Sequence, residues 1–142
     1  MAVVKQRDTY TALKVQPELF SDFLSSFGTH SIKRDLLRNV NDEAVKTSIK
    51  NLLQTNRGER FFNTNIGSDI RSLLFELNSP ATAQVLEDLI RTMISNYEPR
   101  ARVEDVRVTN DEEGHSMTAT IIFSVINRET PIVLEVLLNR IR

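Results

Sequence analysis

The chain of 142 residues has no cysteine, no tryptophan and no long apolar run. Without cysteine it has neither disulfides nor thiolate ligands for a metal, a composition typical of a reducing compartment. No stretch reaches the roughly 18 consecutive apolar residues of a membrane-spanning helix, and residues 1–11 lack the apolar core of a signal peptide. The sequence therefore predicts a domain that folds without covalent cross-links and has no membrane partner.

The chain also has no excess of charge of either sign, because its formal net charge is −1. A protein that binds nucleic acid non-specifically usually has a basic surface, so we expect no nucleic-acid partner. The basic residues are nonetheless uneven, with thirteen arginines and only five lysines. Two explanations of this excess of arginine are equally good. One is codon bias, and the other is a surface rich in protein contacts, where arginine is enriched and lysine depleted.

Patterns that indicate catalysis or cofactor binding are scarce. The four glycines are isolated, so no phosphate-binding loop is present. The two histidines, His30 and His115, lie in predicted loops outside any spaced group of metal ligands. Paired carboxylates could support glycoside hydrolysis, but 19 acidic residues make such pairs easy to imagine; the candidates are Glu59, Asp69, Glu76 and Glu98. We predict no catalytic, cofactor or metal site.

Three helices are predicted between residues 42 and 96. The first spans Asp42–Thr55, and Asn41 or Asp42 can cap its free amides. Its inward face has Val45, Ile49, Leu52 and Leu53. A short helix follows, capped by Ser68 or Asp69, with Ile70, Leu73, Leu74 and Leu77 inward. The third spans 80–96 after a cap at Asn78 or Ser79, and we expect it to bury Leu86, Leu89, Ile90, Met93, Ile94 and Tyr97.

The C-terminal part is predicted to be β. Val106 and Val108 alternate, and a longer alternating strand has Met117, Ala119, Ile121, Phe123 and Val125 on one face. In the last strand Ile132, Leu134, Val136 and Leu138 share a face. The polar turns at 110–114 and 127–131 are too short for parallel crossovers, so an antiparallel meander of three strands is expected. The fold class is α+β, with this sheet packed on the helices.

A second apolar set in these strands points to the opposite side of the sheet: Ile122, Ile126, Val133, Leu137 and Ile141. A sheet with a single helical layer should be polar on that side, so either the N-terminal arm or another chain is expected to cover it. The last strand is a predicted edge, and an edge strand can pair with a strand from another chain.

Residues 1–40 are the least periodic part of the chain. Three of the seven phenylalanines lie between Leu19 and Phe27 without a helical or strand period, and Gly28 interrupts the segment. We interpret residues 1–40 as a loosely structured arm, extended over 29–40, that lies over the core or over a neighbouring molecule. Residues 41–142 are interpreted as a single domain.

Two charged turns remain as candidate contact sites. Pro99 ends the third helix, since the residue before a proline is displaced from the helical region. It lies between Glu98 and Arg100, where the helical half meets the β half, and the other turn is Arg57-Gly58-Glu59-Arg60. A local role is one interpretation: Arg100 satisfies the last helix carbonyls, and Glu98 pairs with it or with an arginine of the other turn. The alternative is a rigid corner that presents a charged fork to a partner.

The segment 49–76, IKNLLQTNRGERFFNTNIGSDIRSLLFE, resembles the phage baseplate wedge and lysozyme-like family. The resemblance continues through SPATAQVLEDLIRTMISNYEPRARVEDVRV and covers about residue 42 to the C-terminus. This family includes the wedge subunit of T-even phage tails and the type VI secretion baseplate subunit TssE. Many members have proline after the equivalent of Arg60 and Pro-x-Phe-Gly before that of Asp69, where this chain has Phe61 and Ile66.

The resemblance implies a structural subunit of a contractile-tail baseplate and not an enzyme. It implies that the corner Glu98-Pro99-Arg100 docks on the core helical bundle of the wedge. We predict Arg57, Gly58, Glu59 and Arg60 as further partner-binding residues. It also implies several copies in a six-fold ring of a virion tail baseplate, assembled in the host cytoplasm, and a sheath subunit as a second partner. Strand exchange with sheath would use Ile132, Val133, Leu134, Glu135, Val136, Leu137 and Leu138.

Two alternatives to the phage wedge subunit stay open. One is a component of a type VI secretion baseplate, which would belong to the same structural class. The other is a peptidoglycan hydrolase, as the lysozyme-like family name suggests, although the residues offer little chemistry for it.

Overall fold

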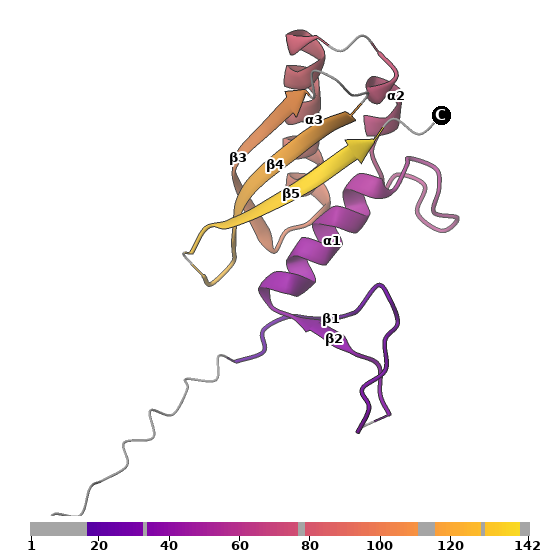
Figure 1. Cartoon of the computed structure of the whole chain (residues 1–142), viewed down its shortest axis with the longest axis vertical. Helices are drawn as coiled ribbons and strands as arrows, with labels where there is room; N and C mark the ends of the chain where they lie inside the picture. Colours follow the sequence, from indigo (N-terminus) through magenta and orange to yellow (C-terminus); the bar gives the residue numbers. More distant parts are fainter. Residues whose placement is uncertain (1–16, 33, 77–78, 111–115, 129, 140–142) are drawn as a thin grey trace, which may run out of the picture.

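The structure, a computed structural model, describes residues 17–32, 34–76, 79–110, 116–128 and 130–139. Within these ranges the chain forms a two-stranded sheet, three helices and a three-stranded sheet (Figure 1). The elements are, in order, β1 (Ser21–Phe23), β2 (Arg38–Val40), α1 (Asp42–Gln54), α2 (Ile70–Leu74), α3 (Pro80–Tyr97), β3 (Ala101–Asn110), β4 (Ser116–Val125) and β5 (Ile132–Asn139). The predicted α+β class is confirmed.

The C-terminal sheet is the expected antiparallel meander with the order β3-β4-β5. Strand β3 begins at Ala101, directly after the corner, rather than near Val106, because Ala101 already pairs with Val125 at the end of β4. A bulge between Val103 and Asp105 shifts the register between β3 and β4. The turn predicted at 110–114 falls largely outside the described residues.

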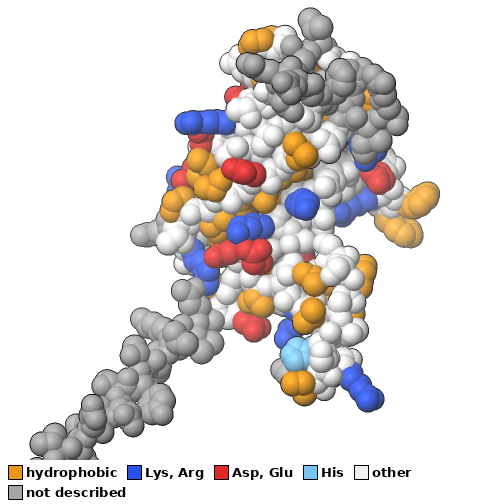
Figure 2. All heavy atoms as spheres, viewed as in Figure 1, with side chains coloured by type: hydrophobic (Ala, Val, Ile, Leu, Met, Phe, Trp, Pro, Cys, Tyr) orange, Lys and Arg blue, Asp and Glu red, His pale blue; other side chains and the backbone are white. Residues whose placement is uncertain are grey.

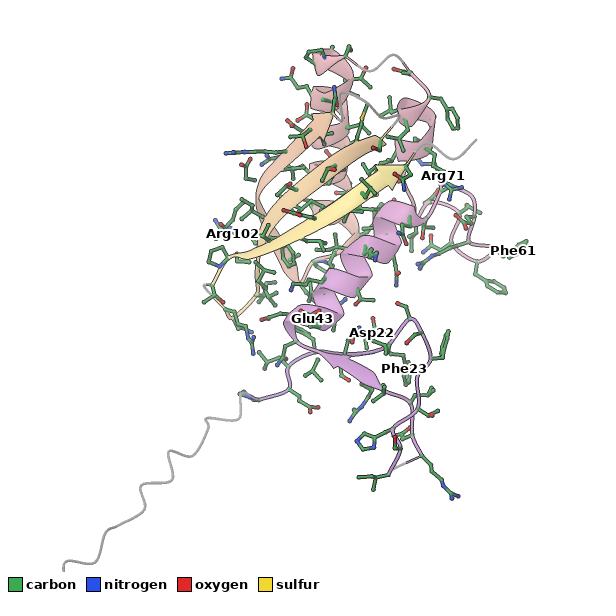
Figure 3. All side chains as sticks on the ribbon, in the orientation of Figure 1. Asp22, Phe23, Glu43, Phe61, Arg71 and Arg102 are labelled. Atoms are coloured by element: carbon green, nitrogen blue, oxygen red, sulfur yellow. The ribbon has the colours of Figure 1, made fainter. Side chains whose placement is uncertain are left out.

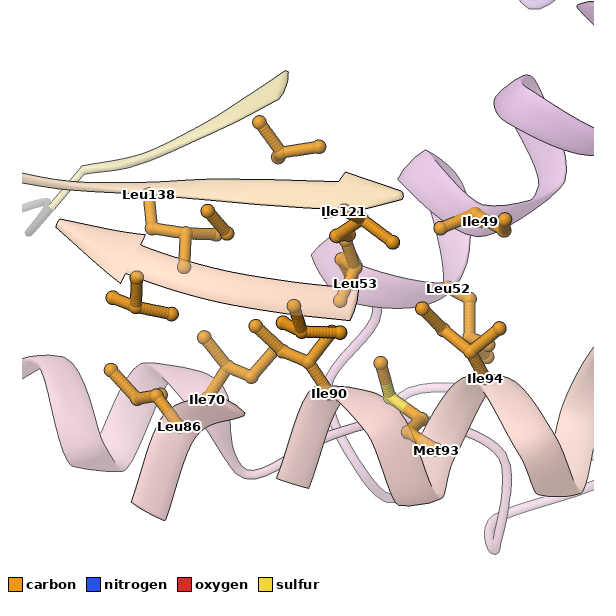
Figure 4. Close-up of a cluster of buried hydrophobic side chains, with 14 of the residues drawn as sticks. Ile49, Leu52, Leu53, Ile70, Leu86, Ile90, Met93, Ile94, Ile121 and Leu138 are labelled. Carbon is orange, nitrogen blue, oxygen red and sulfur yellow. The ribbon is translucent and has the colours of Figure 1, made fainter. Parts of the chain in front are cut away.

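The core lies between one face of this sheet and the helices. The alternating inward residues of β4 are all buried, as predicted. Figure 4 shows Leu86, Ile90, Met93 and Ile94 of α3 facing Ile121 of the sheet and the side chains of α1. Among the described residues no helix is long and apolar enough to cross a membrane.

Two predicted core positions of α3, Leu89 and Tyr97, differ from expectation. Tyr97 is 39% exposed, and its hydroxyl donates a hydrogen bond to the Asn65 carbonyl at 2.7 Å. A tyrosine can leave the core in this way because its hydroxyl gains a partner at the surface. Leu89 is half-buried, whereas Leu77 lies outside the described residues.

The predicted cap of α1 is wrong in its details. Asn41 lies at the N-cap position with a φ of 51°, and its side chain makes no bond to the helix amides. Instead the Asn41 side-chain oxygen accepts hydrogen bonds from the amides of Leu19 (2.8 Å) and Phe20 (3.3 Å). In α3 the cap is as predicted, because the Ser79 hydroxyl accepts from the Thr82 amide at 3.2 Å.

The described part of the N-terminal arm is an ordered hairpin. Strands β1 and β2 pair antiparallel and lie beside the start of α1, below the sheet in Figure 1. This part of the arm leaves the outer face of the C-terminal sheet uncovered. Val133 and Leu137 on that face are 55% and 59% exposed. On the same face Thr118 lies opposite Leu137 and Thr120 lies opposite Glu135, so the outer face is mixed rather than continuously apolar.

Candidate partner-binding surfaces

The corner between α3 and β3 is fixed from both sides. The Glu98 amide donates to the Ile94 carbonyl at 2.8 Å and ends the helix, while the Ala101 amide donates to the Glu98 carbonyl at 3.1 Å. The Arg100 carbonyl then accepts from the Ile126 amide at 2.9 Å, just beyond the end of β4. The backbone therefore holds Pro99, which is exposed, at a defined position between helix and sheet.

Glu98 and Arg100 form a two-pronged ion pair. Arg100 Nε lies 2.6 Å from Glu98 Oε1, and Arg100 Nη2 lies 2.8 Å from Glu98 Oε2. Glu98 is buried, at 3% exposure, whereas the side chain of Arg100 keeps 29%. The guanidinium carbon also lies 5.6 Å from the centre of the Phe20 ring, within range of a cation–π contact. Glu98 thus faces inward and Arg100 occupies the boundary with solvent.

The pKa of the Glu98 carboxyl reflects these contacts. Burial alone would raise this pKa, but hydrogen bonds from Arg100 and Ser48 and the charge of Arg100 outweigh burial and lower it. A glycosidase acid needs the opposite, a carboxyl whose pKa is raised so that it holds its proton. Glu98 is therefore held as an anion that orients Arg100.

The turn Arg57-Gly58-Glu59-Arg60 belongs to a closed loop between α1 and α2. Gly58 has a φ of 84°, and its amide donates to the Thr64 carbonyl at 2.9 Å. The Glu59 carboxylate accepts from the Asn56 amide at 2.8 Å. Arg57 and Arg60 do not reach Glu98; Arg57 lies instead 3.6 Å from Asp69, and both arginines are exposed.

The other proposed carboxylates either have local partners or lie exposed at the surface. Glu59 and Asp69 are engaged within the loop as described, and Glu76 is exposed. His30 lies in the hairpin, where its Nδ1 accepts from the Ile32 amide at 3.2 Å, and His115 lies outside the described residues. Across the described ranges, no three histidine or acidic side chains are grouped in a way that could hold a metal.

Strand β5 pairs only with β4, so its other edge is open in the described chain. Its inward residues Val136 and Leu138 belong to the core, whereas Val133, Glu135 and Leu137 point outward and are exposed. Beside the end of β5 lies a groove of about 270 Å³, lined by the final residues of β5 and by side chains of α1 and α2. The residues predicted for strand exchange are therefore divided between core and surface.

Several contacts at these surfaces are invisible to sequence reasoning. Phe20 contacts Arg100 from 80 residues away and Ser48 contacts Glu98 from 50 residues away, and no local pattern marks either of them. Arg128 bonds Asp42 at 2.7 Å and joins the turn after β4 to the start of α1. Phe61 and Phe62 did have a signal, namely two adjacent aromatic residues inside a polar loop.

Comparison with known proteins places these features in a family. The family model for the baseplate wedge protein gp25 matches residues 39–128. The chain is 32% identical over 94 residues to the baseplate wedge protein gp25 of Enterobacteria phage T4, covering 66% of this chain and 71% of that protein.

Solved structures share the fold. The crystal structure of a tail lysozyme candidate from Geobacter sulfurreducens matches with a TM-score of 0.65 at 24% identity, covering 71% of this chain and 92% of the other. A chain of the anti-feeding prophage baseplate matches with a TM-score of 0.60 at 17% identity, covering 87% of each. A chain of the type VI secretion baseplate complex matches with a TM-score of 0.51 at 20% identity, covering 67% and 91%. Because each identity is below 25%, these likenesses establish the fold alone.

The resemblance inferred from residues 49–76 and from the Glu-Pro-Arg corner is thereby confirmed. The chain belongs to the family of the baseplate wedge protein gp25, the structural wedge components of contractile-tail baseplates.

Proposed function

We propose that this chain joins a contractile-tail baseplate wedge through its corner and offers strand β5 to the first ring of sheath. Family membership supports the wedge assignment. The observation that carries the finer proposal is the position of the two surfaces: the charged corner lies where α3 ends, and the open edge of β5 lies across the sheet from β3. One chain can therefore contact two different partners at once.

At the corner, Arg100 makes the partner contact and Glu98 positions it. The two bonds to Glu98 use Nε and Nη2 of Arg100, which leaves Nη1 and the exposed side of the guanidinium for an acceptor on the wedge bundle. Exposed Pro99 contributes a rigid apolar surface beside it. Glu98 is too deeply buried to reach a partner without a rearrangement. Arg57, Gly58, Glu59 and Arg60 form the second contact of this side.

At the sheet, an added strand would pair with the open edge of β5, from Ile132 to Leu138. Backbone hydrogen bonds supply most of the affinity in such strand addition. Val133, Glu135 and Leu137 would then lie beside outward side chains of the added strand, because neighbouring strands align residues that share a face. The mixed character of this face suits an added strand whose outward side chains, at every second position, include both apolar and polar residues.

We also infer a non-enzymatic role. The buried carboxylate of Glu98 has a lowered pKa, and Glu59 and Asp69 bond to their own loop. Residues 1–40 are proposed as an arm distinct from the domain at 41–142, and the family model begins at residue 39. The partners are baseplate and sheath proteins, in several copies around a six-fold ring.

The strand proposal is tested without removing β5, since deletion would take Val136 and Leu138 out of the core. The double variant Val133→Lys/Leu137→Lys changes only exposed side chains, and an outward lysine is a common means of blocking strand addition. Val85→Lys, at a position 52% exposed on α3, is the matched control. Electron microscopy then counts the tails with full-length sheath.

We expect baseplates that contain the double variant but initiate little sheath, whereas Val85→Lys supports normal tails. Sheath of normal length and frequency on baseplates of the double variant would refute strand exchange at this edge.

A further inference from the structure

Two adjacent phenylalanines stand out at the tip of the loop between α1 and α2. Phe61 is 96% exposed and Phe62 is 106% exposed, more than any other large apolar side chain in the described chain. Figure 3 shows Phe61 pointing away from the body of the molecule, and Figure 2 shows hydrophobic side chains projecting at the same place. Scattered exposed apolar residues need no explanation, but a pair this exposed at one point marks an interaction site.

The loop that holds them is closed at its base. The Ser68 amide donates to the Thr55 carbonyl at 2.9 Å, and the Ser68 hydroxyl donates to the Leu53 carbonyl at 3.3 Å. Gly67 adopts a φ of 137° so close to Asn56 that an added Cβ would lie 2.5 Å from the Asn56 carbonyl oxygen. The two ends of the loop therefore touch through backbone atoms.

Further bonds order the loop toward its tip. The Asn63 amide donates to the Arg60 carbonyl at 3.3 Å, across the two phenylalanines. Ile66 packs against the core, and the Tyr97 hydroxyl holds the Asn65 carbonyl. A loop fixed in this way has already lost much of the freedom that binding would otherwise remove, so presenting aromatic side chains costs little further entropy.

The charges around the pair indicate the chemistry of its partner. Both acidic groups of the loop have partners, because Glu59 accepts from the Asn56 amide and Asp69 lies near Arg57. Arg60, directly before Phe61, has no ion pair among the residues that the structure describes, and neither has Arg71 at the base of the loop (Figure 3). The complementary surface is an apolar pocket with carboxylates at its rim.

We infer that Phe61 and Phe62 form an aromatic anchor that inserts into an apolar, acid-rimmed pocket on a neighbouring baseplate protein, with Arg60 meeting the rim. This inference rests on the proposed function for the identity of the assembly. The two phenylalanines lie outside the corner, strand β5 and the turn 57–60, and Arg60 is the one residue shared with that turn. Aromatic and arginine side chains in central pockets dominate many protein interfaces.

The first test compares assembly of Phe61→Ser/Phe62→Ser with that of Val85→Ser, when each is co-expressed with the other tail proteins of the same source. We expect the loop variant to bind its baseplate neighbours at least 30-fold more weakly, as for the loss of one strong interface residue, and Val85→Ser to bind normally. Arg60→Glu should weaken binding more at low than at high salt, because a rim contact is screened. Incorporation of Phe61→Ser/Phe62→Ser at the wild-type level would overturn the anchor.

The second test follows position 62 directly. The chain has no tryptophan, so Phe62→Trp grown with 5-fluorotryptophan places a single fluorine label there, and Val85→Trp places one on α3. In the assembled baseplate the fluorine NMR resonance of the label at 62 should move and lose its solvent-isotope effect, because the label is then buried. The resonance of the label at 85 should change little. An unchanged signal at 62 refutes the inference, and a shift that depends on the concentration of the isolated chain assigns the pocket to a second copy instead.

Failure of the proposed function gives a different result. In that case the wild-type chain itself does not join the baseplate, whatever residues occupy positions 61 and 62.

Discussion

Replacing Arg100 by alanine tests the ion pair at the corner. The substitution leaves the Glu98 carboxylate, which is 3% exposed, with Ser48 as its remaining side-chain partner. Removing one partner of a buried pair typically costs about 3 to 5 kcal/mol. Arg100 keeps 29% of its side chain in solvent, so water can replace part of the lost interaction. We therefore expect the free energy of unfolding to fall by about 2 to 3 kcal/mol at pH 7.

A loss of that size leaves the chain folded, because domains of this kind are stable by roughly 5 to 15 kcal/mol. The isolated variant should unfold at a lower urea concentration, with its melting temperature reduced by about 6 to 10 °C. If Arg100 also contacts the wedge, Arg100→Ala should bind the wedge more weakly than wild type even where the variant is fully folded, so the loss of stability alone does not account for the loss of binding. Measuring urea unfolding and wedge binding on the same preparation separates the two effects.

The pH dependence gives a second check. The pKa of Glu98 is lowered in the folded state, so the stabilisation is fully present above the unfolded value of about 4.3. It is lost as the pH falls through the lowered folded value. In Arg100→Ala burial is no longer offset, and protonation relieves the unpaired carboxylate. The difference in free energy of unfolding between wild type and Arg100→Ala should therefore be large at pH 7. It should shrink as the pH falls from the Glu98 pKa of the variant, which lies above that of wild type, to the lowered wild-type pKa.

Glu98→Gln serves as the matched control, since it removes the charge without leaving a buried anion. In the Glu98→Gln background, Arg100→Ala should lower the free energy of unfolding much less than it does in the wild-type background. A loss below about 0.5 kcal/mol in the wild-type background at pH 7, or a loss that stays constant down to pH 3.5, would contradict the role assigned to the pair.

Two further substitutions test the local geometry. Gly67→Ala should lower the free energy of unfolding, measured in urea, by about 2 to 4 kcal/mol, because both the φ of 137° and the 2.5 Å approach to Asn56 disfavour a side chain. The control Gly58→Ala, at a φ of 84° in open space, should lower it by only about 1 kcal/mol. Equal losses would show that the close approach to Asn56 is unimportant. Ser79→Ala should lower the free energy of unfolding by about 1 kcal/mol, because it removes the cap of α3. The control Ser95→Ala changes an exposed serine of the same helix and should leave the free energy of unfolding unchanged. A neutral Ser79→Ala would mean that the 3.2 Å bond to the Thr82 amide adds no stability.

The sequence predicted the elements whose signal is local. Pro80 and Pro99 mark the ends of α3, and the alternation from Met117 to Val125 identified the buried face of β4. These patterns depend on periodicity and on backbone restrictions, which act within a few residues. The family resemblance likewise depended on short segments in the right order.

Features that depend on distant contacts were not predicted. Asn41 is a residue type that commonly caps helices, yet its side chain bonds to the amides of Leu19 and Phe20, more than twenty residues earlier. Tyr97 has the spacing of a core residue, yet it bonds to the loop at Asn65. From the sequence, the partner of Glu98 could be either Arg100 or an arginine of the turn 57–60. Only the structure shows that the closed loop at 55–69 holds Arg57 and Arg60 away from Glu98.

Asn41 also couples the segment before β1 to the start of α1. The amides of Leu19 and Phe20 have Asn41 Oδ1 as acceptor, and the backbone amide of Asn41 in turn donates to the Phe20 carbonyl at 2.8 Å. These bonds tie the segment before β1 to Asn41, the residue that directly precedes α1. In hydrogen exchange, Leu19 and Phe20 should open as one unit, with a protection set by α1 rather than by the short strands themselves.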